Sequence, residues 1–265
     1  MGNIIKIAAV SYLNTFPFLY GMQKSEFIKN NSELILAYPS ECARLLLNKE
    51  VNMALVPTGI IPQLKISYII SKYCIGSENK VKSVVLASRV PLKKIREVYL
   101  DYQSATSIRL VRILANYYWD INPVWKQSQP GYERLISDTT AGVIIGDRNF
   151  VNTDYEYIYD LGEEWNKFTS LPFVYAVWLS VKPVDPDFKK EFNNALSIGI
   201  QDIDGVCDFY KKRITPGLDA KKYYTENISY FFNDEKSRGM NSFLKYVRLE
   251  NQQENVLRKE LYAQK

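Results

Sequence analysis

The segment from Ser11 to Phe18 reads Ser-Tyr-Leu-Asn-Thr-Phe-Pro-Phe, and it follows an apolar, strand-like run over residues 4–10. Pro17 has no N–H to lose, so it suits the first turn of a helix that Asn14 or Thr15 can cap. The free N–H groups at such a helix start attract an anion. The segment therefore predicts either a plain capped turn or part of an anion-binding site.

A second group of hydroxyls stands where the strand at residues 98–100 leads into a helix that we expect to reach Trp119. It consists of Ser104, Thr106 and Ser107. One hydroxyl is enough to cap a helix, whereas three in four positions suit a cradle for a carboxylate or phosphate. Both interpretations, capping and anion binding, are open on the residues alone.

Single polar residues mark other places where a ligand could bind. Ser40 can cap the helix predicted over 41–49 or contact an anion, and Thr58 follows a buried strand. Asp101 and Asp147 each stand just past a strand, where a carboxylate can orient a hydroxyl, cap a helix or accept a proton. Ser83 lies among apolar strand residues, so its hydroxyl needs a partner in a side chain, the backbone or a ligand.

The amino-acid types that are missing exclude several kinds of chemistry. The chain has no histidine, which removes Ser–His and Cys–His nucleophile pairs, histidine metal sites and histidine bases. Its three cysteines, Cys42, Cys74 and Cys207, are too widely spaced for a zinc site or a disulfide framework. No phosphate-loop, dinucleotide or metal-ligand motif occurs. Any catalysis would use carboxylates, hydroxyls, amides, lysine, tyrosine or the substrate itself.

Charge and hydropathy narrow the choice of partner. The net charge of +5 is spread along the 265 residues, which fits a small anionic ligand and argues against nucleic acid. No apolar run approaches the ~20 residues of a membrane span. Residues 1–3 lead directly into a strand without a leader pattern, so we expect a cytoplasmic protein with no membrane partner.

Short apolar strands alternate with helices in two series, which predicts an α/β protein with mostly parallel sheets. The first series covers residues 4–56 and the second covers 98–145. Two apolar runs, 82–88 and 173–181, are placed to carry the chain between two lobes. We predict a discontinuous first lobe, 1–86 with 177–265 and a helical tail, and an inserted second lobe, 87–176. A ligand cleft should lie between them.

Several segments, in this order, resemble the menaquinone-biosynthesis chorismate dehydratases of the futalosine pathway. They span residues 4–180 and comprise Ser11-Tyr12-Leu13-Asn14-Thr15 with Pro17, Ala54-Leu55-Val56-Pro57, Ser83-Val84-Val85-Leu86-Ala87-Ser88, Asp101 with Ser104, Thr106 and Ser107, Ile145-Gly146-Asp147, Asp160-Leu161-Gly162 with Trp165, and Leu171-Pro172-Phe173-Val174-Tyr175-Ala176 with Trp178. The chain departs from the family pattern at Thr58-Gly59-Ile60, at Arg148-Asn149, which looks peripheral, and at Ser170.

The resemblance implies a type II periplasmic-binding-protein-like fold and a cofactor-independent hydro-lyase that needs no metal. Its reaction would convert chorismate to 3-[(1-carboxyvinyl)oxy]benzoate and water. Asn14 and Ser83 would lie near the reacting ring as catalytic residues, and a substrate carboxylate would accept the proton, with Asp147 as the second candidate. The expected substrate-binding residues are Ser11, Tyr12, Thr15, Ser40, Thr58, Ser104, Thr106, Ser107 and Asp147.

Three other functions share this fold. The first is 1,4-dihydroxy-6-naphthoate synthase of the same pathway, whose family relies on a histidine that this chain lacks. The second is a solute-binding protein for a small carboxylate, which would carry a leader peptide or a lipid-anchor cysteine. The third is the ligand-sensing domain of a regulator, which would be accompanied by a DNA-binding helix pair.

Overall fold

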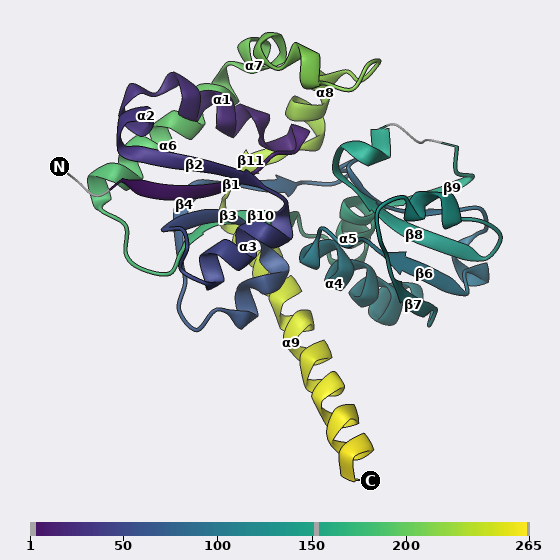
Figure 1. Ribbon diagram of the computed structural model, residues 1–265. Coiled ribbons are helices and arrows are strands. Elements are labelled where there is room, and N and C mark those ends of the chain that lie inside the picture. Colours follow the sequence, from purple (N-terminus) through teal and green to yellow (C-terminus); the bar gives the residue numbers. More distant parts are fainter. Residues whose placement is uncertain (1–3, 151–153, 264–265) are drawn as a thin grey trace.

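The computed structural model describes residues 4–150 and 154–263, with side chains up to residue 252. Two open β-sheets stand side by side, each flanked by helices (Figure 1). No helix in this described part of the chain is long and apolar enough to span a membrane.

The first sheet contains six strands in the order β11-β4-β10-β3-β1-β2. In chain order these strands are β1 (Ile5–Val10), β2 (Ser32–Ala37), β3 (Met53–Pro57), β4 (Tyr68–Ser77), β10 (Phe173–Ser180) and β11 (Ser229–Phe231). The helices that accompany it are α1 (Phe16–Lys24), α2 (Glu26–Asn31), α3 (Pro39–Leu47), α6 (Pro186–Gln201), α7 (Ile203–Phe209), α8 (Ala220–Lys222) and α9 (Asp234–Ala263). Figure 1 shows α1, α2 and α6 on one side of the sheet and α3 on the other.

The second sheet contains five strands in the order β7-β6-β8-β5-β9. They are β5 (Val84–Ser88), β6 (Glu97–Leu100), β7 (Val124–Gln127), β8 (Thr140–Ile145) and β9 (Tyr157–Asp160). Helices α4 (Ala105–Leu114) and α5 (Leu161–Thr169) pack on it and on each other. Buried side chains of the strands and of the helices packed on them form the main apolar core, including Trp165 of α5, Trp178 of β10 and Phe192 of α6. Burial of such large side chains is the main source of stability.

The α/β class was predicted correctly, but the sheets are mixed rather than mostly parallel. Strands β1, β2 and β3 pair in parallel, as do β6, β7 and β8. Strand β10 is antiparallel to both β3 and β4, and β5 is antiparallel to both β8 and β9. An apolar run reveals burial but not strand direction, so the sequence pattern could not separate these cases.

The predicted lobe boundaries can be compared with the sheets to which β5 and β10 belong. Strand β5 belongs to the second sheet and β10 to the first, so the predicted boundaries at 86/87 and 176/177 fall inside these strands. We therefore propose that the chain crosses at residues 78–83 and 170–172. Under this proposal the first lobe comprises the residues before and after those crossings, and the second lobe lies between them.

A buried carboxylate holds the first crossing in place. Asp160, the last residue of β9, accepts hydrogen bonds from the backbone N–H groups of Val81 (3.1 Å) and Lys82 (2.6 Å). It also caps α5 by accepting from the N–H groups of Gly162 (3.0 Å) and Glu163 (3.1 Å). Burial raises the pKa of this carboxyl, and the four N–H donors oppose that rise. Asp160 thereby fixes the chain that leads directly into Ser83.

Replacing Asp160 with alanine should destabilise the protein more than an ordinary loss of a helix cap. Asp185→Ala is the matched control, because Asp185 caps α6 through two N–H groups at an exposed position. The control should lower the unfolding free energy by about 0.5–2 kcal/mol. Asp160→Ala should lose at least about 1 kcal/mol more, because two further buried N–H groups lose their acceptor. Urea denaturation would measure both, and equal losses would contradict the bridging role.

Candidate active site

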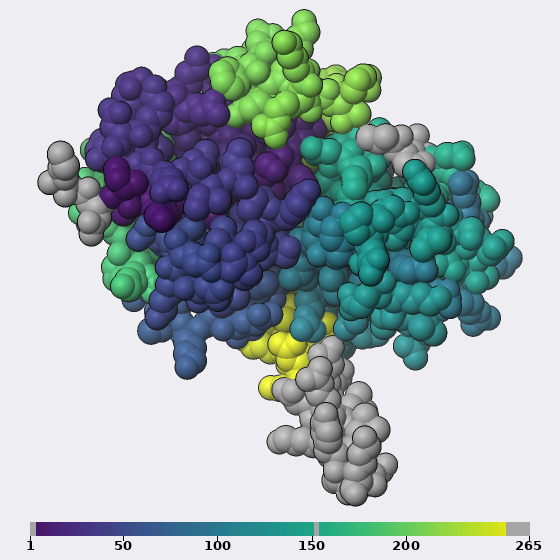
Figure 2. Space-filling view, in the orientation of Figure 1, coloured from purple at the N-terminus to yellow at the C-terminus, as the bar shows by residue number. Residues whose placement is uncertain are grey.

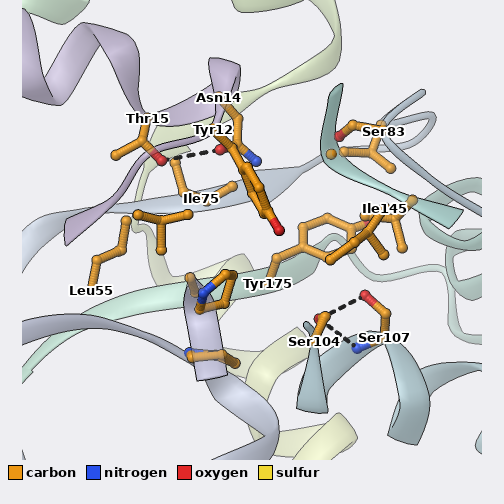
Figure 3. A pocket seen from close by; sticks show the side chains of 17 residues that line it. Tyr12, Asn14, Thr15, Leu55, Ile75, Ser83, Ser104, Ser107, Ile145 and Tyr175 are labelled. Atoms are coloured by element: carbon orange, nitrogen blue, oxygen red, sulfur yellow. Dashed lines mark hydrogen bonds between the residues drawn. The ribbon is translucent and has the colours of Figure 1, made fainter. Parts of the chain in front are cut away.

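A pocket lies where the two sheets face each other. It encloses about 530 Å³ of space between protein atoms, including the part open to solvent. Figure 2 shows the first half of the molecule, in purple and blue, meeting the teal second half along a continuous line. Seventeen residues from both halves line the pocket (Figure 3): Val10, Tyr12, Asn14, Thr15, Pro39, Leu55, Pro57, Ile75, Val81, Ser83, Val84, Ser104, Ser107, Ile145, Gly146, Tyr175 and Ala176.

The pocket lining is apolar apart from hydroxyl groups and one amide. Its polar side chains belong to Tyr12, Asn14, Thr15, Ser83, Ser104, Ser107 and Tyr175. None of the described lining residues carries a charge. A bound anion would be held by neutral donors, whose hydrogen bonds are stronger inside a protein than in bulk solvent.

Asn14 and Thr15 follow β1 in a short helical turn, Leu13–Thr15. The Thr15 hydroxyl donates to the Asn14 amide oxygen at 3.1 Å, and the buried Tyr230 hydroxyl donates to the Asn14 carbonyl at 3.0 Å. With its amide oxygen occupied, Asn14 has its NH₂ group available for a ligand, and Figure 3 shows that group on the cavity side. Pro17 lies in the first turn of α1 as predicted, but neither predicted side chain caps this helix.

Ser83 occupies the opposite side of the pocket, directly before β5. Its hydroxyl accepts a hydrogen bond from the Tyr223 hydroxyl at 2.8 Å, and its carbonyl accepts from the Gly146 N–H at 2.8 Å. The backbone φ of Gly146 is +63°, a conformation that favours glycine. The partner that the buried Ser83 hydroxyl requires is therefore a distant side chain.

The start of α4 brings two serines into the pocket. Ser104 is the N-cap residue, and its hydroxyl oxygen accepts from the Ser107 N–H at 3.2 Å. The two serine hydroxyls are 2.9 Å apart. The capping prediction for this group is confirmed. Since both residues also line the pocket, the cap coincides with a place where an anion would meet hydroxyls and the positive end of a helix.

Thr58 and Thr106, which the sequence predicts to bind substrate, are not among the residues that line the pocket. The Thr106 hydroxyl accepts from the Gly59 N–H (3.0 Å) and donates to the Tyr175 carbonyl (3.1 Å). The Thr58 hydroxyl donates to the Val174 carbonyl at 2.7 Å. A β-carbon on Gly59 would approach the α4 backbone to 3.0 Å, so this contact depends on glycine. We assign both threonines to holding α4 against the first sheet.

Ser40 and Ser11 also lie outside the pocket lining. Helix α3 begins at Pro39 with Tyr38 as its N-cap, so Ser40 is inside the helix, exposed, and not the predicted cap. Proline suits the first helical position, and this preference outweighed the capping tendency of serine. The Ser11 carbonyl accepts from the exposed Arg213 guanidinium at 3.4 Å. Their predicted contacts with substrate have no support in this arrangement.

Asp147 joins the two halves beside the pocket. Its carboxylate accepts from the Leu13 N–H at 3.1 Å, and burial raises the pKa of the carboxyl. The residue is not part of the lining. Its position suits a fixed contact between the halves better than proton transfer inside the cavity.

Sequence reasoning missed a hydrogen-bond network next to Tyr12. The Tyr12 hydroxyl donates to the Gln103 side-chain oxygen, which also accepts from Arg148 at 3.2 Å. Arg148 forms an ion pair with the fully buried Asp101, which also accepts from the Tyr132 hydroxyl at 2.9 Å. The sequence comparison with the family pattern suggested that Arg148 is peripheral. The ion pair with Asp101 shows that it is not. No local pattern in the sequence links these residues.

No side chain in the pocket lining is suited to accept a proton near neutral pH. Burial raises the pKa of Tyr12 and of Tyr175 far above the ordinary value for a phenol, so both remain protonated. The other polar lining groups are serine and threonine hydroxyls and the Asn14 amide. Within residues 4–150 and 154–252, no group of three or more His, Cys, Asp or Glu side chains could hold a metal ion.

Comparisons with known proteins agree with this arrangement. The family model described as menaquinone biosynthesis matches residues 5–249. A relative named chorismate dehydratase, from Thermus thermophilus, is 24% identical over 262 residues, covering 88% of this chain and 91% of the relative.

Solved structures show the fold. Protein AF1704 from Archaeoglobus fulgidus matches with a TM-score of 0.73 at 15% identity, covering 93% of this chain and 97% of that one. The CA3427 product of Candida albicans, described as having the generic periplasmic binding protein fold, matches with a TM-score of 0.60 at 14% identity, covering 94% and 91%. The sulphonate-binding protein SsuA from Escherichia coli gives 0.59 at 13%, covering 97% and 94%. The chain has a periplasmic-binding-protein-like fold.

Removing the Thr106 hydroxyl should loosen the contact that places Ser104 and Ser107. Thr106→Val keeps the shape of the side chain but leaves the buried Gly59 N–H without its acceptor, so the unfolding free energy should fall by about 1–3 kcal/mol. Thr225→Val is the control, because Thr225 is exposed and its hydroxyl bonds within its own turn. The control should stay within about 0.5 kcal/mol of the parent. Thermal and urea unfolding would show whether the two variants differ.

Proposed function

The chain belongs to the menaquinone biosynthesis family, and we propose that it is a chorismate dehydratase acting in the futalosine pathway. Its reaction would convert chorismate into 3-[(1-carboxyvinyl)oxy]benzoate and water. The observation that carries the proposal is the uncharged pocket in which Asn14, Ser83 and the Ser104–Ser107 helix start face one cavity. The similarity to a named chorismate dehydratase supports the choice of substrate. We place this biosynthetic step in the cytoplasm.

The pocket offers two separate groups of donors for the two carboxylates of chorismate. One carboxylate would bind at the start of α4, where Ser104 and Ser107 add hydroxyls to the helix dipole. The other would meet the first sheet's donors at Asn14 and Thr15. Tyr12 and Tyr175 present rings to the space between these groups, which suits a flat six-membered ring (Figure 3).

The reaction removes the elements of water from neighbouring ring carbons. The carbon that carries the enolpyruvyl ether loses its proton, and the electrons of that C–H bond form the ring double bond as the adjacent C–O bond breaks. The proton released from carbon ends on the departing hydroxyl, which becomes water, so charge and atoms balance. Because the product ring is aromatic, the enzyme mainly needs to position groups and stabilise developing charge.

The proton acceptor follows from the absence of a base among the described lining residues. The enolpyruvyl carboxylate lies within the same molecule as the C–H bond that breaks, and we assign it as the base. Asn14 and Ser83 act as donors, one orienting that carboxylate and the other stabilising the leaving hydroxyl. This mechanism needs no metal and no organic cofactor.

A binding protein for a small carboxylate is the second candidate, because an uncharged pocket between two halves would also suit simple capture. The naphthoate synthase of the same pathway is disfavoured, since the chain has no histidine. Incubation of the purified protein with chorismate, without added metal, separates these cases. Mass spectrometry should show loss of one water with the enolpyruvyl group retained. Chorismate that stays unchanged in the presence of folded protein would contradict the enzyme.

Variants at Asn14 and Asp147 test the assignment of roles. Asn14→Ala should lower kcat/KM by about 100-fold or more, which is the usual effect of losing a donor that stabilises transition-state charge. Asp147→Asn should stay within about threefold of the parent, because its amide oxygen can still accept from the Leu13 N–H. If Asp147→Asn lost more kcat/KM with chorismate than Asn14→Ala, Asp147 would be the base.

The pH dependence of kcat/KM should be flat between about pH 6 and pH 8.5. The two lining tyrosines have raised pKa values and stay protonated, and carboxylates of the substrate ionise well below this range. If Asp147 were the base, activity would fall as the pH dropped through its raised pKa, because the protonated carboxyl accepts no proton. A rate profile with an acidic limb inside this window, absent in Asp147→Asn, would contradict the substrate-carboxylate mechanism.

A further inference from the structure

Tyr223 reaches Ser83 from a distant part of the chain. It begins the π-helical turn Tyr223–Asn227 and lies 140 residues after Ser83. Its hydroxyl donates to the Ser83 hydroxyl oxygen at 2.8 Å, and both residues are at most 2% exposed. The Tyr223 ring also packs edge-on against Phe150 at 5.2 Å between centroids. Tyr223 does not line the pocket, so it contacts the site through Ser83.

The hydrogen bond from Tyr223 determines whether the Ser83 hydroxyl donates or accepts a hydrogen bond in the pocket. A serine hydroxyl has one proton to donate and two lone pairs that accept. In the structure the Tyr223 hydroxyl is the donor and the Ser83 hydroxyl oxygen is the acceptor, so one lone pair of Ser83 is occupied. The proton of Ser83 is then left for an acceptor in the pocket that Ser83 lines.

We propose that Tyr223 is a positioning residue that fixes Ser83 as a hydrogen-bond donor to the leaving hydroxyl of the substrate. The inference rests on the proposed dehydratase function. A hydroxyl that accepts one hydrogen bond donates a stronger one, because successive hydrogen bonds polarise each other. A donor aimed at the leaving oxygen acts most strongly in the transition state, where that oxygen gains negative charge. The same bond makes Ser83 a weaker base, which agrees with proton transfer to the substrate carboxylate.

The neighbouring Tyr224 provides a matched control. It lies in the same turn and is equally buried, at 2% exposure. Its hydroxyl has no hydrogen-bond partner among the described residues, whereas that of Tyr223 bonds to Ser83. A Tyr→Phe change at either position removes one oxygen atom from the same buried region. Only the change at 223 removes a contact with the pocket.

The test compares Tyr223→Phe, Tyr224→Phe, Ser83→Ala and the double variant Tyr223→Phe/Ser83→Ala in the full chain with chorismate. Tyr223→Phe should lower kcat about tenfold or more, with KM within about twofold, because the lost interaction acts in the transition state. Tyr224→Phe should stay within about twofold in kcat. Adding Tyr223→Phe to Ser83→Ala should cause no further loss, since Tyr223 acts through Ser83.

The outcomes separate failure of this inference from failure of the proposed function. A parent protein that leaves chorismate unchanged overturns both. An active parent with equal kcat in Tyr223→Phe and Tyr224→Phe overturns the role of Tyr223 and retains the dehydratase. A further loss of kcat on adding Tyr223→Phe to Ser83→Ala shows a structural effect and also overturns it. If Tyr223→Phe does not fold, Tyr223→Met removes the same hydroxyl and the same comparison applies.

Discussion

The absence of charge from the pocket lining is the constraint on which the rest of the site depends. A dianionic ligand in this cavity would meet hydroxyls, an amide and the start of a helix, and no lysine or arginine among the described lining residues. Neutral donors bind an anion well only if they are already oriented and water is kept away. Two of the residues that carry such donors are held from outside the cavity, since Tyr230 bonds to the Asn14 carbonyl and Tyr223 bonds to the Ser83 hydroxyl.

These partners come from the far end of the chain, so the site is assembled by the tertiary fold. Tyr223 and Tyr230 follow the return of the chain to the first sheet, after the second sheet is complete. Contacts such as Leu13 with Asp147, and Thr106 with the Tyr175 carbonyl, then hold the two halves against each other. The donors for the two ends of a ligand are consequently fixed relative to one another, which is the condition for a reaction driven by positioning.

Capping was predicted correctly at the start of α4 but not at the starts of α1 and α3, and long-range partnerships were not predicted at all. One of Ser104, Thr106 and Ser107 was expected to cap α4, and Ser104 does so through the N–H group three residues later. Thr58 and Thr106 carry the same hydroxyl chemistry, but their partners are backbone groups of distant elements, which no spacing reveals. The prediction of mostly parallel sheets was wrong for a related reason. An apolar run shows that a strand is buried, but it does not show in which direction the strand runs. No signal in the sequence distinguished Tyr223 from the other tyrosines of the chain, which has 20 in all.

The central claim is that this uncharged cavity binds the substrate's two carboxylates with neutral donors. A crystal structure of the protein with 3-[(1-carboxyvinyl)oxy]benzoate, the proposed product, tests it most directly. We expect one carboxylate within hydrogen-bonding distance of Ser104 and Ser107, the other at Asn14 and Thr15, and the ring between Tyr12 and Tyr175. A product molecule held by arginine or lysine side chains, or located outside this cavity, would contradict the account.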